Sequence, residues 1–173
     1  MSKDQEGHSA AYERIRSKKT LGEILEVATS FEKAAFDFYT ALVPKVSKNL
    51  RYLVEELAAE EKEHFDLFDK LAKDPQVEEQ IHQQIQTPVE DHRFSDYIQL
   101  PDLGNKPDDQ AILQYAVGRE DAAMKQYREL ADSTQPGPVH DLFEYLANEE
   151  TKHKRELEKL YYETVYSGGP GNN

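Results

Sequence analysis

The sequence predicts an all-α protein, a four-helix bundle with one long crossover between its second and third helices. Apolar residues recur at helical spacing in four long segments, and no segment shows sustained strand-like alternation. Short breaks separate the first segment from the second and the third from the fourth, whereas a long connection lies between the two pairs. We assign the bundle to residues 20–163, after a polar arm over 1–19 and before a flexible Gly-rich tail over 164–173.

The first predicted hairpin joins a helix that begins at Thr20 to a helix over about 49–73. Thr20 and Glu23 are typical of a capping box, and Pro44 should kink or end the first helix. Asp74 and Pro75 should end the second helix. The apolar stripes are Leu25, Ala28, Phe31, Ala35, Phe38, Leu42 and Val46 in the first helix, and Leu50, Leu53, Leu57, Phe68 and Leu71 in the second.

The second predicted hairpin follows a proline-rich connection over 74–108, which could hold a short helix at 76–86. Its first helix begins near Asp108 and ends in the turn 133–138, and Pro138 suits the first turn of the helix that follows. The stripes are Leu113, Ala116, Ala123 and Leu130 in the third helix, and Val139, Leu142, Leu146, Leu157 and Leu160 in the fourth.

The composition excludes several classes of protein. Apolar residues make up 38% of the 173 residues, which is enough for a core, and the absence of cysteine excludes disulfides, iron–sulfur clusters and thiolate zinc sites. A net charge of −13 argues against nucleic acid as a partner. No run approaches the roughly 20 apolar residues of a membrane span, and the N-terminus resembles no signal peptide. We therefore expect a soluble, cytoplasmic protein without a membrane partner.

Polar side chains interrupt each apolar stripe at positions that should face the core. The first and third helices each place a glutamate and, seven residues later, a tyrosine on the stripe, while the second and fourth each place a Glu-x-x-His pair there. Every helix therefore points one carboxylate inward. The residues are Glu32 and Tyr39, Glu61 and His64, Glu120 and Tyr127, and Glu150 and His153.

These interruptions repeat between the two halves of the chain. The segment FEKAAFDFY (31–39) aligns with REDAAMKQY (119–127), and residues 53–71 align with 142–160 with both adjacent glutamates and the histidine in common. The halves therefore look like duplicated helical hairpins. A two-fold arrangement of the hairpins would bring four glutamates and two histidines together.

Such a buried set favours a metal centre. Four buried carboxylates would repel one another at high cost, whereas two divalent cations would neutralise their charge of −4. Oxygen and nitrogen donors suit iron or manganese. His64 alone would be an ordinary core histidine, so the prediction depends on the six residues jointly. A third pair, Glu79 and His82, lies off the apolar stripe and is expected to be solvated.

With these motifs, the sequence resembles the ferritin-like di-iron superfamily, and more closely its rubrerythrin-like branch, over about residues 20–162. The resemblance implies a carboxylate-bridged centre of two iron ions, with manganese or another divalent metal as the alternative. It implies that Glu61 and Glu150 bridge the metals, that Glu32 and Glu120 are terminal carboxylates, and that His64 and His153 are terminal nitrogen ligands.

Four neighbouring residues are candidates for supporting roles. Glu60 and Glu149 precede the bridging candidates, where family members often keep an acid that accepts the N–H of a ligand histidine; the alternative is that both are merely exposed acids. Tyr39 and Tyr127 could donate hydrogen bonds to ligand carboxylates or supply electrons, or they could simply pack in the core.

The sequence also departs from the family pattern. Rubrerythrins proper carry a further glutamate where this chain has Ala123, and a rubredoxin module that needs four cysteines. Electrons must therefore come from an external donor or from ferrous iron. Bacterioferritin has a haem-ligating methionine where this chain has Lys62, and a fifth helix, whereas only residues 163–173 follow Tyr162. A ferritin-type shell is therefore not expected. The resemblance instead implies a homodimer, because rubrerythrin-like proteins usually associate and the long 74–108 connection offers a surface for it.

Three functions remain open at this point. The resemblance implies a non-haem di-iron oxidoreductase that reduces peroxide or dioxygen. A ferroxidase or iron-handling protein that oxidises Fe(II) is the first alternative, because the same half-reaction serves both. A metal-free helical interaction module, with the inward acids facing water or a partner, is the second.

Overall fold

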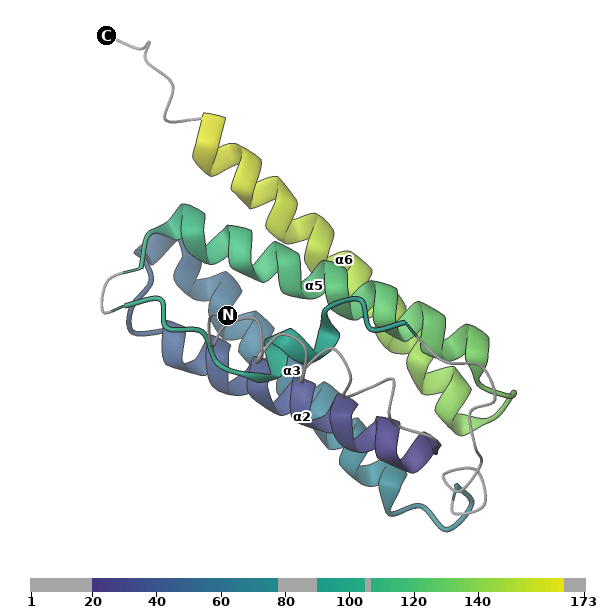
Figure 1. Ribbon diagram of the computed structural model, residues 1–173. Helices are drawn as coiled ribbons and strands as arrows, with labels where there is room; N and C mark the ends of the chain where they lie inside the picture. The colour runs from purple at the N-terminus through teal and green to yellow at the C-terminus, as the bar shows by residue number, and fades with distance from the viewer. Residues whose placement is uncertain (1–19, 78–89, 105–106, 167–173) are drawn as a thin grey trace, which may run out of the picture.

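The computed structural model describes residues 20–77, 90–104 and 107–166 of the chain. Four long helices account for most of this part (Figure 1): α2 (Leu21–Leu42), α3 (Lys48–Ala72), α5 (Asp109–Ser133) and α6 (Pro138–Tyr166). A short 3₁₀ helix, η1 (Phe94–Ile98), lies in the connection between α3 and α5. None of the helices in the described ranges is both long enough and apolar enough to cross a membrane.

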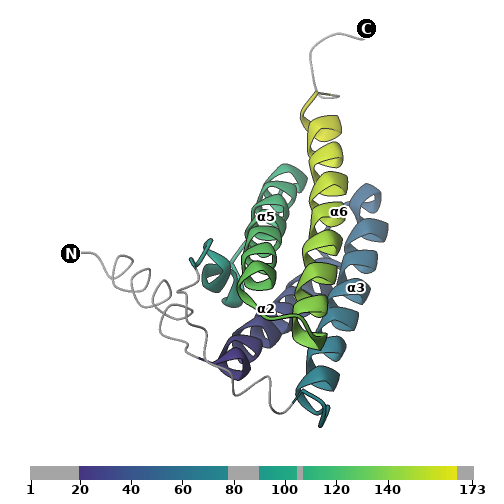
Figure 2. The ribbon, with the colours of Figure 1, turned by 90° about the vertical axis from the view of Figure 1, so that its right-hand side faces the viewer.

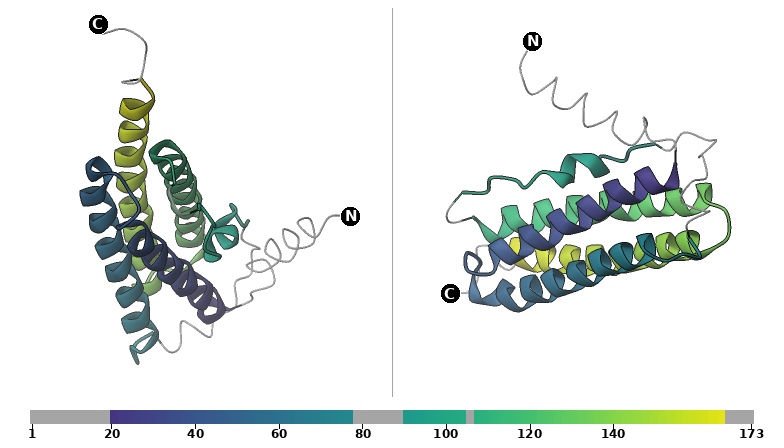
Figure 3. Two further views of the ribbon diagram at one scale, coloured as in Figure 1. Left: turned by 90° about the vertical axis from the view of Figure 1, so that its left-hand side faces the viewer. Right: turned by 90° about the horizontal axis from the view of Figure 1, so that it is seen from below.

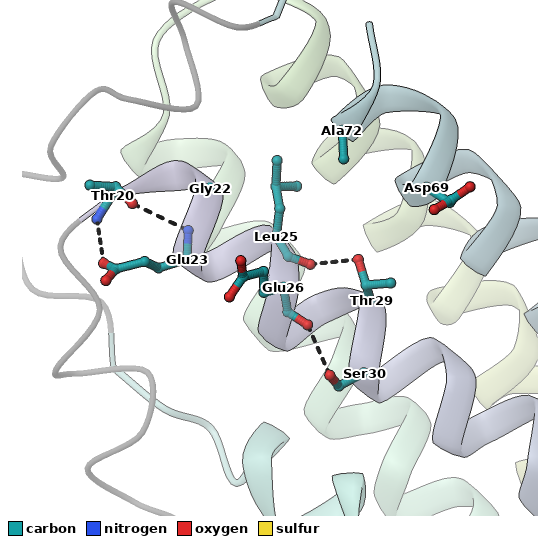
Figure 4. Close-up of a pocket in the computed structure, with 9 residues that line it drawn as sticks. All are labelled: Thr20, Gly22, Glu23, Leu25, Glu26, Thr29, Ser30, Asp69 and Ala72. Carbon is teal, nitrogen blue, oxygen red and sulfur yellow. Dashed lines mark hydrogen bonds between the residues drawn. The ribbon is translucent and has the colours of Figure 1, made fainter.

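Side-chain caps and prolines set the helix ends. The Thr20 Oγ1 atom accepts the Glu23 amide N–H at 3.2 Å, and Glu23 Oε2 accepts the Thr20 amide N–H at 3.1 Å, so the capping box is formed (Figure 4). Asp108 Oδ1 accepts the Gln110 amide N–H at 2.7 Å and caps α5 in the same way. Helix α2 ends two residues before Pro44, and α6 opens with Pro138 at its first position.

The helices form two hairpins that pack face to face. Helix α2 packs along α3, and α5 packs along α6. Helix α6 lies between α5 and α3 (Figure 2), while η1 lies against α2 and α5 on the side away from α6 (Figures 2 and 3). This arrangement is the four-helix bundle that the sequence predicts, with η1 of the crossover packed on the α2–α5 side.

The apolar core is divided into two clusters along the bundle axis. One contains the first three turns of α2, the end of α3, the second half of α5 and the start of α6. The other contains the end of α2, the first half of α3, the start of α5 and Leu157 of α6. Between the two clusters every helix buries at least one glutamate, among them Glu32 on α2 and Glu120 on α5, so the middle of the bundle contains a polar layer with apolar packing at both ends.

Two details differ from the sequence-based expectation. Helix α6 continues to Tyr166, three residues beyond the predicted end of the bundle at 163. The crossover contributes to the core, which the sequence did not predict: Phe94 of η1 is buried, stacks on Phe31 of α2 at a ring-centroid distance of 4.1 Å and meets Tyr127 of α5 edge-on at 5.5 Å. The short helix expected at 76–86 lies almost wholly outside the described residues.

Candidate metal centre

The polar layer consists of the six side chains that interrupt the predicted stripes. All of them are at most 3% exposed, and each helix of the bundle contributes at least one. We refer to them as the six-residue cluster, made up of Glu32 on α2, Glu61 and His64 on α3, Glu120 on α5, and Glu150 and His153 on α6.

The cluster contains two overlapping groups of potential ligands. In each group, four residues offer one oxygen or nitrogen atom apiece, and these atoms lie within 4.8 Å of one another. Glu61 and Glu150 belong to both groups, so they occupy the shared centre. The first group adds Glu32 and His64, and the second adds Glu120 and His153.

Both imidazoles turn their Nδ1 atoms towards the carboxylates. The Nδ1 atom of His64 lies 3.2 Å from Glu150 Oε1, 3.4 Å from Glu61 Oε2 and 3.6 Å from Glu32 Oε2. The Nδ1 atom of His153 lies 3.1 Å from Glu150 Oε2. The two rings are nearly parallel, with centroids 5.8 Å apart. His64 therefore belongs to the first group and His153 to the second, and Glu150 contacts both histidines.

Two buried tyrosines hold the outer glutamates from the opposite hairpin. Tyr39 of α2 donates its hydroxyl hydrogen to Glu120 Oε1 of α5 at 2.8 Å. Tyr127 of α5 donates to Glu32 Oε1 of α2 in a close hydrogen bond. The bonds cross between the hairpins, and each leaves the other oxygen of its glutamate available. Of the roles considered for Tyr39 and Tyr127, these hydrogen bonds favour one, which is to orient the carboxylates of the outer glutamates.

The two acids that precede the shared glutamates differ in their contacts. Glu60 Oε2 lies 2.6 Å from His153 Nε2, on the outer side of that imidazole, and the bond to the histidine lowers the pKa of the Glu60 carboxyl against the opposing effect of its partial burial. Glu149 Oε1 lies instead 2.6 Å from Lys152 Nζ on the same helix. The two halves thus contribute equivalent residues to the six-residue cluster, but the acids beside it make different contacts in each half.

Burial and mutual repulsion control protonation in the shared centre. Burial raises the pKa of Glu61 to about 8, helped by the charges of Glu120 and Glu32. Burial likewise raises the pKa of Glu150 to about 7, helped by Glu120 and Glu61. Without a cation, both shared glutamates therefore bind protons more tightly than an exposed glutamate does.

For His64, His153 and Glu120, neighbouring groups favour the charged form of the side chain over the neutral form. Burial would lower the pKa of His64, but the surrounding carboxylates, Glu150 first, more than offset this effect and raise it. The same balance raises the pKa of His153. For Glu120, hydrogen bonds from Glu150 and His153 outweigh burial and hold its pKa below the ordinary value. Without a cation, the cluster thus favours protons on its histidines and on the two shared glutamates.

The donor set fits a pair of divalent cations. Each of the four glutamates has one buried oxygen, Glu32 Oε2, Glu61 Oε2, Glu120 Oε2 or Glu150 Oε1, that no hydrogen-bond donor within the described ranges satisfies. An unsatisfied buried acceptor costs about 1–3 kcal/mol, and more when it is charged. Two cations would remove four such penalties and balance four negative charges, with only oxygen and nitrogen ligands.

One buried ionic residue beside the cluster was not predicted from the sequence. Arg119, immediately before Glu120 on α5, is only 1% exposed. The sequence did contain a sign of this burial, because Arg119 continues the helical spacing of Ile112 and Ala116. An arginine on an apolar stripe is, however, normally expected to reach solvent.

Two further groups of potential ligands occur near the surface in the described ranges. Glu90 and His92, just before η1, lie near Glu129 of α5, and His140, Asp141 and Glu144 lie in the first turns of α6. The members of both are exposed or half-buried, unlike the six-residue cluster. The pair Glu79 and His82 lies outside the described residues.

Comparison with known proteins agrees with this geometry. A model of the rubrerythrin family matches residues 23–100 and 111–167, which is most of the chain and includes the whole six-residue cluster. The chain belongs to the rubrerythrin family. Among curated proteins no significant relative was found.

A solved structure shows the same fold. This rubrerythrin-family chain is similar to a crystal structure from Thermotoga maritima described as a ferritin-like diiron-carboxylate protein, with a TM-score of 0.68 and 20% sequence identity. The alignment covers 84% of this chain and 96% of that one. The ferritin-like class of the bundle is therefore confirmed.

Proposed function

We propose that this rubrerythrin-family protein is a non-haem di-iron oxidoreductase that reduces peroxide or dioxygen. The observation that supports this most strongly is the pair of overlapping ligand groups, each with three carboxylates and one imidazole, that share Glu61 and Glu150. Two groups with two common members are what a pair of adjacent, carboxylate-bridged ions requires.

The proposed ligands follow from this sharing. Glu61 and Glu150 would bridge the two ions, Glu32 and His64 would complete one coordination sphere, and Glu120 and His153 would complete the other. Iron is the expected metal, with manganese or another divalent cation as the alternative, because the donors are carboxylates and imidazoles without thiolates. A ferrous pair, when bound, can supply two electrons to an O–O bond.

The chain's own residues provide the surroundings for this chemistry. The two apolar clusters close the polar layer from both ends, and its six side chains are at most 3% exposed, so they have little contact with bulk water. Tyr39 and Tyr127 fix the outer carboxylates and can share their hydroxyl protons with them. The 173 residues contain no cysteine that could ligate an electron-transfer iron, so we propose that a separate donor returns the electrons.

The test begins with metal content. Protein purified from iron-replete cells should contain about two irons per chain by elemental analysis, and the glutamate-to-alanine variants of the shared centre, Glu61→Ala and Glu150→Ala, should lose the pair. Glu56→Ala, an exposed position on the same helix as Glu61, is the matched control and should keep it. Absence of metal in the wild type, with thermal stability unchanged by added ferrous ion, would instead indicate a helical interaction module.

The substrate is tested by rapid mixing. The anaerobic ferrous protein is mixed with either hydrogen peroxide or dioxygen, and the rise of ferric absorbance is followed. Faster oxidation by peroxide, with the iron count staying near two, supports the oxidoreductase. Faster oxidation by dioxygen, with many irons retained per assembly, would indicate an iron-handling ferroxidase. A sedimentation measurement on the same samples tests the homodimer, and the cytoplasmic location remains a prediction.

A further inference from the structure

The six-residue cluster is almost closed to solvent, so a cation can reach it only if a side chain moves aside. None of its members is more than 3% exposed. Apolar packing covers both ends of the polar layer, and η1 covers the α2–α5 side, where Phe94 stacks on Phe31. Within each hairpin the two helices pack along one another, whereas the backbones of α3 and α6 come close at few points. The α3–α6 side, which lies away from η1 (Figures 2 and 3), is therefore the thinnest cover in the described part of the chain.

Both histidines of the cluster reach this side through one half-exposed side chain. Tyr145 of α6 meets the His64 ring edge-on, with ring centroids 6.5 Å apart, and is itself 47% exposed. Glu60 of α3 contacts the Nε2 atom of His153 at 2.6 Å, and its side chain is 38% exposed. Because the two imidazoles lie 5.8 Å apart, these two contacts are neighbours on one surface.

Of the tyrosines that contact the cluster, Tyr145 is the one that can move most easily. Its hydroxyl has no hydrogen-bond partner among the described residues, and an exposed side chain changes rotamer within picoseconds to nanoseconds. Tyr39 and Tyr127 are buried, and each is held by a hydrogen bond to a glutamate of the cluster. Rotation of Tyr145 would uncover His64 without breaking a hydrogen bond or opening the apolar core.

The charges on the α3–α6 side suit the approach of a cation. Lys152 pairs with Glu149 at 2.6 Å, so the positive charge of its ammonium is offset. Glu60 uses its Oε2 atom for His153, and its Oε1 atom has no partner among the described residues. A half-exposed carboxylate beside the cluster attracts divalent cations from solution.

We propose that cations enter and leave the six-residue cluster between α3 and α6, and that Tyr145 opens and closes this path over His64. The inference rests on the proposed function only in requiring that the cluster bind cations. With its ring over His64, Tyr145 keeps solvent from the imidazole; with its ring turned outward, it gives a cation a path past Glu60 to the carboxylates. Tyr145 therefore controls the rate of exchange and contributes little to the affinity, because it lies outside both groups of potential ligands.

The test compares the rates of Mn²⁺ exchange in variants at this position. Tyr145→Ala removes the ring, whereas Tyr145→Phe keeps the ring and removes only the hydroxyl. Tyr162→Ala is the matched control, because Tyr162 is 56% exposed on the same helix and its ring lies against Tyr161 and Tyr166. Association is followed by stopped-flow mixing of metal-free protein with Mn²⁺ and a weak chromophoric indicator, and dissociation is followed by transfer of Mn²⁺ to excess chelator.

The proposed path predicts that both rate constants rise together. In Tyr145→Ala the association and dissociation rate constants should each increase about tenfold, which corresponds to a barrier lower by about 1.4 kcal/mol, while the dissociation constant stays within about threefold of the wild type. Tyr145→Phe and Tyr162→Ala should exchange Mn²⁺ within about twofold of the wild-type rates.

Two results would overturn the inference. Unchanged rates in Tyr145→Ala would show that cations take another path. Faster dissociation alone, with weaker affinity, would show that Tyr145 only positions His64. Should Tyr145→Ala fail to fold, Tyr145→Ser is measured against the same criteria.

The outcomes separate this inference from the proposed function. A wild-type protein that binds two Mn²⁺ per chain, together with a Tyr145→Ala variant of equal exchange rates, would refute the path past Tyr145 and leave the metal centre intact. A wild-type protein that binds no cation would refute both.

Discussion

Replacing Glu61 by glutamine should stabilise the metal-free protein while it disables the metal centre. Glu61 is 1% exposed, and its pKa is raised from the ordinary 4.5 to about 8. At pH 7 the folded metal-free protein therefore keeps a proton on Glu61 that the unfolded chain releases. Holding that proton about 2.5 pH units above the ordinary pKa costs about 3 kcal/mol of folding free energy.

Glutamine occupies the same volume and never ionises, so it avoids this cost. We expect metal-free Glu61→Gln to gain up to about 3 kcal/mol at pH 7, or roughly 6–12 °C in thermal midpoint for a chain of this size. Addition of Mn²⁺ should stabilise the wild type and have little effect on the variant, because a neutral amide replaces the shared carboxylate. Thermal and urea unfolding, with chelator and then with Mn²⁺, measure both effects.

The pH dependence supplies a second measure of the same cost. Between about pH 4.5 and 8 the folded state binds one more proton at Glu61 than the unfolded state, so wild-type metal-free stability should fall as pH rises. This group alone contributes up to about 1.4 kcal/mol per pH unit, and the raised pKa of Glu150, about 7, adds a slope of the same sign up to that pH.

In Glu61→Gln the pH slope should be shallower. Glu56→Gln, exposed on the same helix, should change neither the slope nor the stability by more than about 0.5 kcal/mol. The reasoning would be refuted if metal-free Glu61→Gln were less stable than the wild type at pH 7, or if its pH slope equalled that of the wild type.

Four further substitutions, one of them a control, test separate parts of the structure. Glu60→Gln should weaken Mn²⁺ binding about 10–100-fold by chelator competition, because it loses a charged contact to a ligand imidazole, whereas Glu149→Gln should leave binding near the wild-type value; equal effects would contradict the asymmetry. Tyr127→Phe should cost about 1–3 kcal/mol in urea unfolding, since the acceptor on Glu32 stays buried, and a neutral result would show that this bond is not formed in solution. Thr20→Ala should cost about 1 kcal/mol through loss of the capping box, with cation affinity unchanged.

Much of the fold could be predicted because local chemistry fixes the helix ends. The box at Thr20, the cap at Asp108 and the opening proline at 138 are each recognisable from a few adjacent residues, and the three helices that they open begin within about two residues of the predicted positions. The position of Phe94 was not predictable in this way. Its burial depends on Phe31 and Tyr127, which lie on two helices far from it in sequence.

The cluster itself was predictable because its members interrupt the apolar stripes of the helices, and the same interruptions occur in both halves of the chain. Whether an individual neighbour supports a histidine depends on smaller differences between the halves. Glu149 has Lys152 three residues later on its own helix and pairs with it, whereas the corresponding residue in the first half is the acid Glu63. Glu60 has no such local cation and turns to the imidazole of His153 instead.

The crossing hydrogen bonds of the two tyrosines have a consequence for how this protein assembles. Within one hairpin alone, Tyr39 would have no acceptor and Glu32 no donor, because each finds its counterpart only on α5. The same holds for the second hairpin in reverse. A peptide of either half alone would therefore lack these hydrogen bonds and half of the six-residue cluster. The complete set of potential ligands forms only when the two hairpins dock.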